Sequence, residues 1–431
     1  MQLRPRLRAL SYARHRQWRY ASSVSAFGNV MQTICDHSLG VAPAAHGSRR
    51  GTPADEEEPM TDTVQGRSTA ISEGGSMNHP FHSRSGLNME AFIAPIWRVS
   101  RLVLIGLGIY LTLALALVAT NLPTAAAQPA DLDLSALEGT GTTAVPVLQF
   151  YTTRDGTQLA FRLYESNAEA DTVLLLLHGS AWHSLQFAPL AGAISEQGLA
   201  HVVTPDLRGH GFTPTRRGDV DYIGQFEDDL ADLIERAQTR FPGARVVVGG
   251  HSLGGGLAVR FAGGPHGTLA DGYVLLAPFL KHDAPTTRPN AGGWARPLVR
   301  RIVGLSMLNA FGLTQLNHLT VIQFAMPETV LAGPLGASVT TAYSYRLNTA
   351  YAPRPNYGAD LAAIRQPLLV IAGDADETFI AAQYEPTITA HTGTGSYIVL
   401  PGVTHIGLLT DEGAKAALRN WLEAFNASDR P

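Results

Sequence analysis

The pattern of hydrophobic and polar positions divides the chain into four parts. Residues 1–88 are rich in Arg, Ser, His and Gly and show no sustained periodicity, which is typical of disordered or wrongly annotated sequence. An apolar stretch follows within residues 98–127, and residues 128–146 have the small and turn-forming composition of a linker. From residue 147 to 427, short apolar runs alternate with helical patterns, so we expect one folded domain there.

The apolar stretch predicts a membrane segment. Leu102 to Leu122 contains no charge, and a helix of about 20 residues crosses the hydrocarbon core of a bilayer. Arg98 and Arg101 precede it and acidic residues follow, so the positive-inside rule places the C-terminal body outside the cytoplasm. Ala125-Ala126-Ala127 resembles a signal-peptidase site, so the segment is either an anchor or a cleaved signal peptide. A buried core helix is the remaining alternative.

Two methionines offer alternative starts for this chain. A start at Met89, and less so at Met77, places Arg98 and Arg101 in a short charged region before the apolar stretch, as signal peptides and anchors have it. We therefore expect the natural protein to begin near Met89.

The pattern of residues 147–427 predicts an α/β fold with a mostly parallel sheet covered by helices on both faces. Asp155-Gly156 is a hairpin signal between two alternating segments, and Thr172 to Leu177 is a continuous apolar run, as in a central strand. Strand-like runs then alternate with helical patterns, which favours parallel strands joined by helices. The predicted strands are 147–152, 158–164, 172–177, 201–204, 245–248, 272–276, 367–372 and 397–400, and the predicted helices are 222–237, one from Ser252, 379–390 and 411–425.

Two further features concern the packing of this domain. In the helix after Asp221, Tyr222, Phe226 and Leu230 share one stripe, which predicts a core-facing side. Between about 279 and 355 the strand and helix alternation breaks, and a segment with helical patterns of its own intervenes. We interpret it as a helical lid over the carboxyl ends of the strands, where open α/β sheets bind ligands; a structural insertion is the alternative.

Ser252 is the candidate nucleophile. Gly250-His251-Ser252-Leu253-Gly254 fits the pattern G-x-S-x-G, follows an apolar run and precedes a helix-compatible stretch. This strand-turn-helix setting is that of a nucleophile elbow, in which small glycines permit the sharp turn. The helix N-terminus then favours the negative charge that develops during attack.

A serine hydroxyl needs a base to remove its proton, and the base needs an orienting carboxylate. Gly373-Asp374-Ala375-Asp376 follows a predicted strand, and we choose Asp376 as the acid, with Asp374 as a rival that can brace the loop. His405 follows the next predicted strand and is the candidate base, whereas His391 ends a helical pattern. A turn after a central strand, at His178-Gly179, predicts an oxyanion hole made by the amide of Ser180 or Ala181 together with that of Leu253. Trp182 either lines the acyl pocket or only packs.

Composition removes several function classes. The net charge of −4, with hydrophobic residues at 45% and charged residues at 16%, gives no basic patch, so we expect no nucleic acid partner. The single cysteine, Cys35, excludes an internal disulfide and a thiolate metal cage. The predicted chemistry requires no metal and no cofactor.

Together these motifs resemble the α/β-hydrolase superfamily over residues 147–427. His178-Gly179-Ser180, the turn Asp206-Leu207-Arg208-Gly209-His210-Gly211 and the elbow are similar to the branch of monoacylglycerol lipases, lysophospholipases and serine aminopeptidases. The resemblance implies that this turn is scaffold, that Asp376 is the acid and that His405 is the base. The lid region does not resemble a particular subfamily.

The sequence therefore predicts a serine esterase or lipase-like enzyme that forms an acyl-enzyme on Ser252. A small-molecule or lipid ester, of the acyl glycerol or lysolipid kind, is the expected substrate, and residues 102–122 would bind the membrane if uncleaved. Alternatives are a peptidase or thioesterase of the same fold, or an inactive binding module.

Overall fold

The structure, a computed structural model, describes residues 89–124, 145–289 and 293–428. Its contacts divide the chain into two units, residues 1–109 and 110–431. The expectations for residues 1–88, for the Ala125-Ala126-Ala127 cleavage site and for most of the linker lie outside the described residues.

The apolar segment forms the helix α2 (Met89–Ala119). Its residues Trp97–Ala119 have a mean hydropathy of 2.6, and only 11% of the most apolar window is buried. At 1.5 Å per residue this stretch is about 34 Å long, enough to cross a bilayer. A helix of the globular core would be mostly buried, so this alternative is disfavoured, whereas a signal sequence would have the same length and composition.

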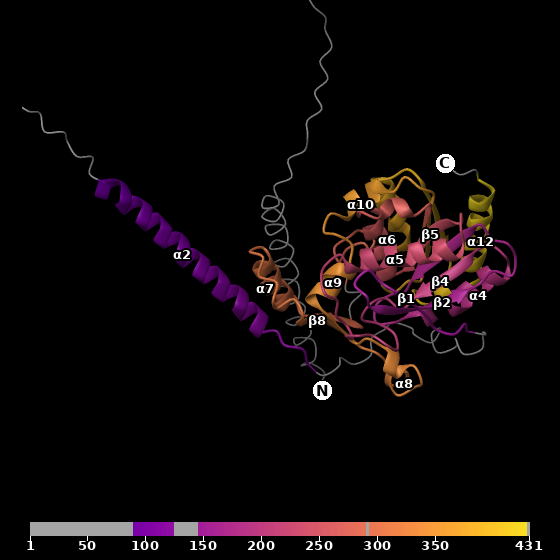
Figure 1. Cartoon of the computed structure of the whole chain (residues 1–431), viewed down its shortest axis with the longest axis horizontal. Coiled ribbons are helices and arrows are strands. Elements are labelled where there is room, and N and C mark those ends of the chain that lie inside the picture. The colour runs from indigo at the N-terminus through magenta and orange to yellow at the C-terminus, as the bar shows by residue number, and fades with distance from the viewer. Residues whose placement is uncertain (1–88, 125–144, 290–292, 429–431) are drawn as a thin grey trace, which may run out of the picture. The chain divides into compact units, whose positions relative to one another are not determined.

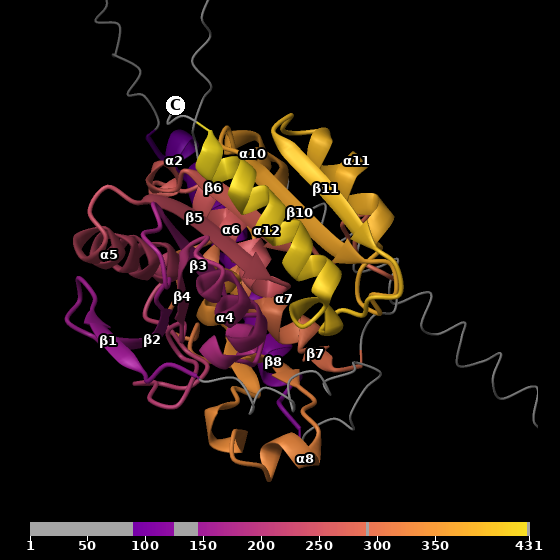
Figure 2. The ribbon, with the colours of Figure 1, turned by 90° about the vertical axis from the view of Figure 1, so that its right-hand side faces the viewer.

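An eight-stranded sheet forms the core of the second unit (Figures 1 and 2). Its order is β1-β2-β4-β3-β5-β6-β10-β11; β2 runs antiparallel to both of its neighbours, and the other pairs are parallel. This confirms the predicted mostly parallel sheet. The strands are β1 (Gln149–Thr152), β2 (Gln158–Tyr164), β3 (Thr172–Leu177), β4 (His201–Pro205), β5 (Arg245–His251), β6 (Gly272–Leu276), β10 (Leu368–Gly373) and β11 (Gly395–Leu400).

Helices cover both faces of this sheet. Helices α4 (Ala188–Glu196) and α12 (Glu412–Ala427) pack together in front of the strands in Figure 2, and α6 (Leu253–Ala262) packs with α10 (Tyr357–Ala363) on the other face. The amphipathic α5 (Gln225–Arg240) packs beside β1, and the short α11 (Tyr384–Thr389) packs near β11. With both faces covered, β3, β5 and β6 are buried along their whole length, which explains their continuous apolar runs.

One local prediction was wrong. Helix α5 begins at Gln225 because Gly224 has a φ of 110° and ends the preceding loop, so Tyr222 lies before the helix instead of on its buried stripe. Tyr222 is 44% exposed, and its hydroxyl donates a hydrogen bond to Asp228. Phe226 and Leu230 are buried, as predicted.

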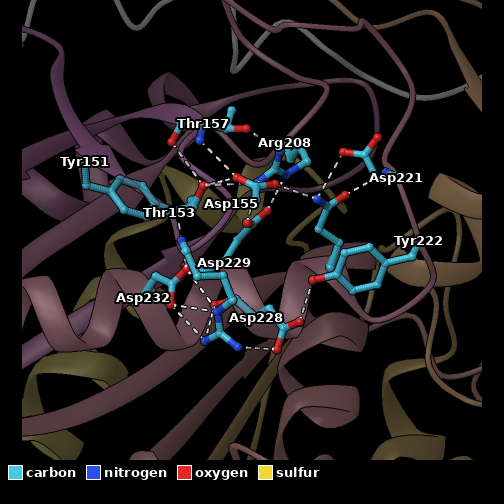
Figure 3. Close-up of polar contacts among 12 residues, drawn as sticks. Tyr151, Thr153, Asp155, Thr157, Arg208, Asp221, Tyr222, Asp228, Asp229 and Asp232 are labelled. Atoms are coloured by element: carbon cyan, nitrogen blue, oxygen red, sulfur yellow. Dashed lines mark hydrogen bonds and ion pairs between the residues drawn. The ribbon is translucent and has the colours of Figure 1, made fainter.

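A polar network ties the β1–β2 hairpin to the rest of the domain (Figure 3). The buried guanidinium of Arg208 donates two hydrogen bonds to the carboxylate of Asp229 on α5, at 2.8 and 2.7 Å, and one to Thr157. It also forms an ion pair with Asp155 at the hairpin turn. These contacts join three elements far apart in sequence, which agrees with a scaffold role for Arg208.

The segment between β6 and β10 is an insertion that combines helices with a small sheet. A helical segment was predicted, but β7, β8 and β9 form a three-stranded antiparallel sheet that was not. These strands have three to five residues, too few for a periodic signal. The elements before α10 are β7 (Ala295–Pro297), α7 (Val299–Asn309), β8 (Thr320–Phe324), α8 (Glu328–Leu331), β9 (Ala342–Ser344) and α9 (Tyr345–Tyr351).

Candidate active site

Ser252 lies in the sharp turn between β5 and α6. Its φ of 55° and ψ of −121° are strained for a residue with a side chain, and strain of this kind gathers at functional sites. The turn is held because the Ser252 amide donates to Leu276, and its carbonyl accepts from Phe279. A Cβ at Gly254 would lie 2.1 Å from the carbonyl oxygen of Leu177, so only glycine permits α6 to approach the end of β3 this closely.

The predicted acid and base are in direct contact. His405 Nδ1 lies 2.7 Å from Asp376 Oδ2, and both side chains are buried. The other carboxylate oxygen, Oδ1, accepts hydrogen bonds from the amides of Thr378 and Phe379, at 2.8 and 2.7 Å. Burial raises the pKa of Asp376, but the interaction with His405 and these hydrogen bonds outweigh it and lower the pKa below its ordinary value. Asp376 is therefore held as a carboxylate that can orient the imidazole.

Asp374, the rival acid, has a different position. Its side chain is exposed, and its Oδ1 accepts a hydrogen bond of 2.6 Å from the amide of Gly402. This contact joins the loop after β10 to the loop after β11. Asp374 thus braces the two loops and does not reach the imidazole.

Ser252 and His405 line the same cavity, which has about 350 Å³ of empty space when the part open to solvent is included. In the described part of the chain no hydrogen bond joins the Ser252 hydroxyl to His405; such contacts are often long without substrate and tighten when it binds. The remaining walls are mainly apolar. They are Gly179, Ser180, Trp182, Gln186, His251, Trp294, Met326 and Ile406.

The backbone amides predicted to form the oxyanion hole differ in whether they are free to donate to a substrate. The amide of Ala181 donates a 2.6 Å hydrogen bond to the hydroxyl of Tyr343, and Ala181 is fully buried, so the prediction of Ala181 as a donor was wrong. Its φ of 64° turns the chain so that the preceding Ser180 lines the cavity instead. The amide of Leu253 is the first of α6 and has no acceptor within the helix. Ser180 and Leu253 therefore remain the candidate pair.

Sequence reasoning missed two residues that hold the site together. Gln186 accepts a hydrogen bond from the Gly179 amide, and its side-chain nitrogen lies 2.7 Å from His251 Nδ1. The other ring nitrogen of His251 lies 3.0 Å from the carbonyl oxygen of His405. Burial, helped by the nearby His405, lowers the pKa of His251 to about 3, so the ring stays neutral at physiological pH. This chain of contacts connects the oxyanion turn to the base.

The insertion contributes a third missed residue, Tyr343 on β9. Its hydroxyl accepts the hydrogen bond from Ala181 and lies 2.8 Å from Nε2 of His210, in the turn that the sequence assigned to the scaffold. The amide of Thr340 also donates to the carbonyl of Ala181. The insertion therefore holds the oxyanion loop through both backbone groups of one residue, the amide and the carbonyl of Ala181. Nothing in the local sequence around Tyr343 indicates this contact.

The described residues contain no group of three or more His, Cys, Asp or Glu side chains placed to hold a metal ion. The chemistry available here is that of a hydroxyl, an imidazole, a carboxylate and backbone amides. This set fits nucleophilic attack on a carbonyl carbon.

Comparisons with known proteins agree with this architecture. A family model described as serine aminopeptidase, S33, matches residues 168–411. A monoacylglycerol lipase of Mycolicibacterium smegmatis is 25% identical over 254 residues, which cover 58% of this chain and 86% of the relative. Protein phosphatase methylesterase 1 of Bos taurus is 35% identical, but over only 24% of this chain and 26% of its own length. A monoglyceride lipase structure from Saccharomyces cerevisiae aligns with a TM-score of 0.51 at 18% identity, over 69% of this chain and 98% of that one.

Proposed function

This chain belongs to the serine aminopeptidase S33 family of α/β-hydrolases, and from that premise we propose that it hydrolyses carboxylic esters through an acyl-enzyme on Ser252. The observation that carries the proposal is that the strained Ser252 and His405 line one cavity, while Nδ1 of His405 lies 2.7 Å from a carboxylate oxygen of Asp376. The relatives named as lipases and as a methylesterase all act on ester bonds, which supports an ester as substrate.

In the proposed mechanism His405 Nε2 takes the proton of the Ser252 hydroxyl while Oγ attacks the ester carbonyl carbon. The oxygen of the tetrahedral intermediate accepts hydrogen bonds from the amides of Leu253 and Ser180, each worth about 3 kcal/mol of barrier. His405 then gives its proton to the leaving alcohol, and a water molecule, activated by the same imidazole, releases the acid. Asp376 keeps the ring oriented and stabilises its charged form.

We propose an acyl glycerol or a lysolipid as the substrate class. The cavity walls include Trp182, Trp294, Met326 and Ile406, which offer apolar surface to an acyl chain.

The proposed location of the catalytic domain is outside the cytoplasm. Arg98 and Arg101 precede the apolar part of α2, and by the positive-inside rule that end of the helix faces the cytoplasm, so the domain after the helix lies on the other side.

A fluorophosphonate probe tests the nucleophile. We expect the full-length chain to be labelled once per molecule and Ser252→Ala to lose both labelling and hydrolysis of p-nitrophenyl esters. Ser306→Ala, which removes a hydroxyl from α7, is the matched control and should label normally. Failure of the folded protein to label would favour an inactive binding module, and faster turnover of aminoacyl amides than of esters would favour a peptidase.

A further inference from the structure

The end of α2 and the residues after it lie along one side of the insertion. The Tyr110 hydroxyl donates to the carbonyl of Met307 at 3.3 Å, and its ring contacts that of Phe311, with centroids 5.2 Å apart. Two turns further along α2, the buried side chain of Arg301 donates to the carbonyl of Val118. Residues near the end of α2 thus contact the start of α7, and earlier residues contact its end, so the two helices are antiparallel.

A glycine permits the close approach of the two helices. A Cβ on Gly304 of α7 would lie 2.5 Å from the carbonyl oxygen of Ala114 and 3.0 Å from the amide nitrogen of Val118. Among the side chains of α2 that the structure describes, Ala114 and Val118 are the buried ones. Small residues at a helix contact are how membrane helices pack closely.

The chain after α2 continues this contact. The Asn121 side chain accepts a hydrogen bond from the Arg300 amide in the first turn of α7, whose amides lack partners within the helix. Thr124 exchanges two hydrogen bonds with the side chain of Gln323 on β8, at 3.1 and 2.8 Å, and its hydroxyl accepts one from Arg296 on β7. Removal of a signal peptide after Ala127 would remove all of these contacts.

Charged residues of the insertion lie at the start of α7, beside the end of α2, and are absent from the rest of α7. Arg296, Arg300 and Arg301 lie beside the end of α2, but from residue 302 to 327 the chain contains no Asp, Glu, Lys or Arg. Phe311 and Leu313, which follow α7, are 55% and 39% exposed. Tyr110 lies nine residues before Ala119, or about 14 Å along the helix, close to half of the hydrocarbon thickness.

We propose that α2 stays on the mature chain as an anchor and pairs with α7, which enters the outer half of the bilayer with its uncharged end inward. The antiparallel strands β7 and β8, which bind Thr124, are flanked in sequence by Trp294 and Met326, and these two residues line the candidate catalytic cavity. On the function proposed above, the cavity then receives an ester that is dissolved in the membrane.

Cross-linking in membranes tests the helix pair without use of the enzymatic activity. In a Cys35→Ser background of the full-length chain, Tyr110→Cys with Phe311→Cys should be joined by a short dithiol-reactive linker. Ala116→Cys with Phe311→Cys is the matched control, because Ala116 is exposed and lies about 200° around α2 from the contact face. The intact mass should include residues 110–127. A mature N-terminus at Gln128, or equal cross-linking of both pairs, would overturn the proposal.

The depth of the end of α7 in the bilayer is measured with a fluorophore attached to Leu313→Cys, in vesicles of lipids whose acyl chains carry a quencher. We expect at least threefold more quenching there than at Val399→Cys, which is also an exposed apolar position, at 49%. Equal quenching would refute insertion of α7.

The role of the pair in substrate entry is tested by Ala114→Leu, which should separate the helices. It should lower turnover of an ester embedded in vesicles about tenfold and leave a soluble short-chain ester unaffected, whereas Ala116→Leu should change neither. Equal loss on both esters would argue against entry from the membrane. Absence of activity in the parent protein would refute the proposed function and leave the cross-link and quenching results standing.

Discussion

The central strands and the insertion differ in how completely they are buried. Strands β3, β5 and β6 are buried at every position, whereas β8 of the insertion is buried at two of its five positions. Both regions line one cavity: the sheet presents Ser252 and His405, and the insertion presents Trp294 and Met326. On the proposed function, the sheet would fix the reacting groups, and the less buried insertion would shape the space around the substrate.

The division is incomplete, however, because the insertion also contacts the catalytic loops. Arg288 donates a 2.7 Å hydrogen bond to the carbonyl of Asp376, and Tyr343 binds the amide of Ala181. Substitutions on the two sides of this boundary can show how far the insertion controls chemistry as well as substrate fit.

The largest effect is expected at the acid. Asp376→Asn leaves the shape intact but removes the charge that orients His405, so kcat should fall by roughly 10³ to 10⁴, as for other serine triads. Asp374→Asn, two residues away and exposed, should change kcat by less than about threefold. Steady-state kinetics on a soluble ester measures both. If the two variants lost equal activity, the assignment of the acid would be wrong.

The next effect concerns the packing that creates the elbow. In Gly254→Ala the added methyl group must push apart α6 and the end of β3, since it would meet two carbonyl oxygens at 2.1 and 2.4 Å. We expect the free energy of unfolding to fall by about 3 kcal/mol. Gly393→Ala is the control, because a Cβ there meets nothing within 4 Å. Denaturant titration compares them, and a Gly254→Ala protein as stable as the control would contradict the packing argument.

A smaller effect should follow from the insertion. Tyr343→Phe removes the acceptor for the buried Ala181 amide and the partner of His210, so the oxyanion loop should loosen and kcat should fall about tenfold, or about 1.4 kcal/mol of barrier. Tyr222→Phe is the control, because it removes the hydroxyl of an exposed residue in the loop before α5, and it should keep full activity. A change confined to KM would mean that the insertion acts on substrate fit alone.

Much of the sheet side could be predicted from the sequence, for a physical reason. Strands β3 and β6 have the predicted boundaries because a strand buried on both faces must be apolar throughout. The resemblance to α/β-hydrolases likewise implied Asp376 as the acid, and in the structure it is Asp376, not Asp374, that lies against His405.

The contacts that were missed join residues far apart in the chain. Tyr343 reaches Ala181 across 162 positions, and Gln186 reaches His251 across 65. A single tyrosine or glutamine in an irregular segment carries no local pattern, so only the folded chain reveals these partners. The same holds for Gly304, whose close neighbours are on α2.

The smallest effect of a substitution, when expressed per pH unit, concerns the stability of the chain in acid and the buried histidines of the sheet side. Burial lowers the pKa of His251 to about 3, and those of His178 and His183 to about 4, from an ordinary value near 6.5. Between about pH 6.5 and pH 4 the unfolded chain binds protons at these rings and the folded chain does not. The free energy of unfolding must therefore fall as the pH falls through this range, and the slope fades once the folded rings also protonate.

Replacing one of these rings should flatten that slope. His251→Gln removes one group that titrates only on unfolding, so the dependence of the free energy of unfolding on pH should weaken by about 1 kcal/mol per pH unit between pH 6 and pH 4. Denaturant titrations at pH 7, 6, 5 and 4 give the comparison independently of any loss at neutral pH. Equal slopes in the parent and in His251→Gln would mean that the His251 ring binds its proton as readily in the folded chain as in the unfolded chain. That result would contradict the argument that burial keeps this ring neutral next to His405.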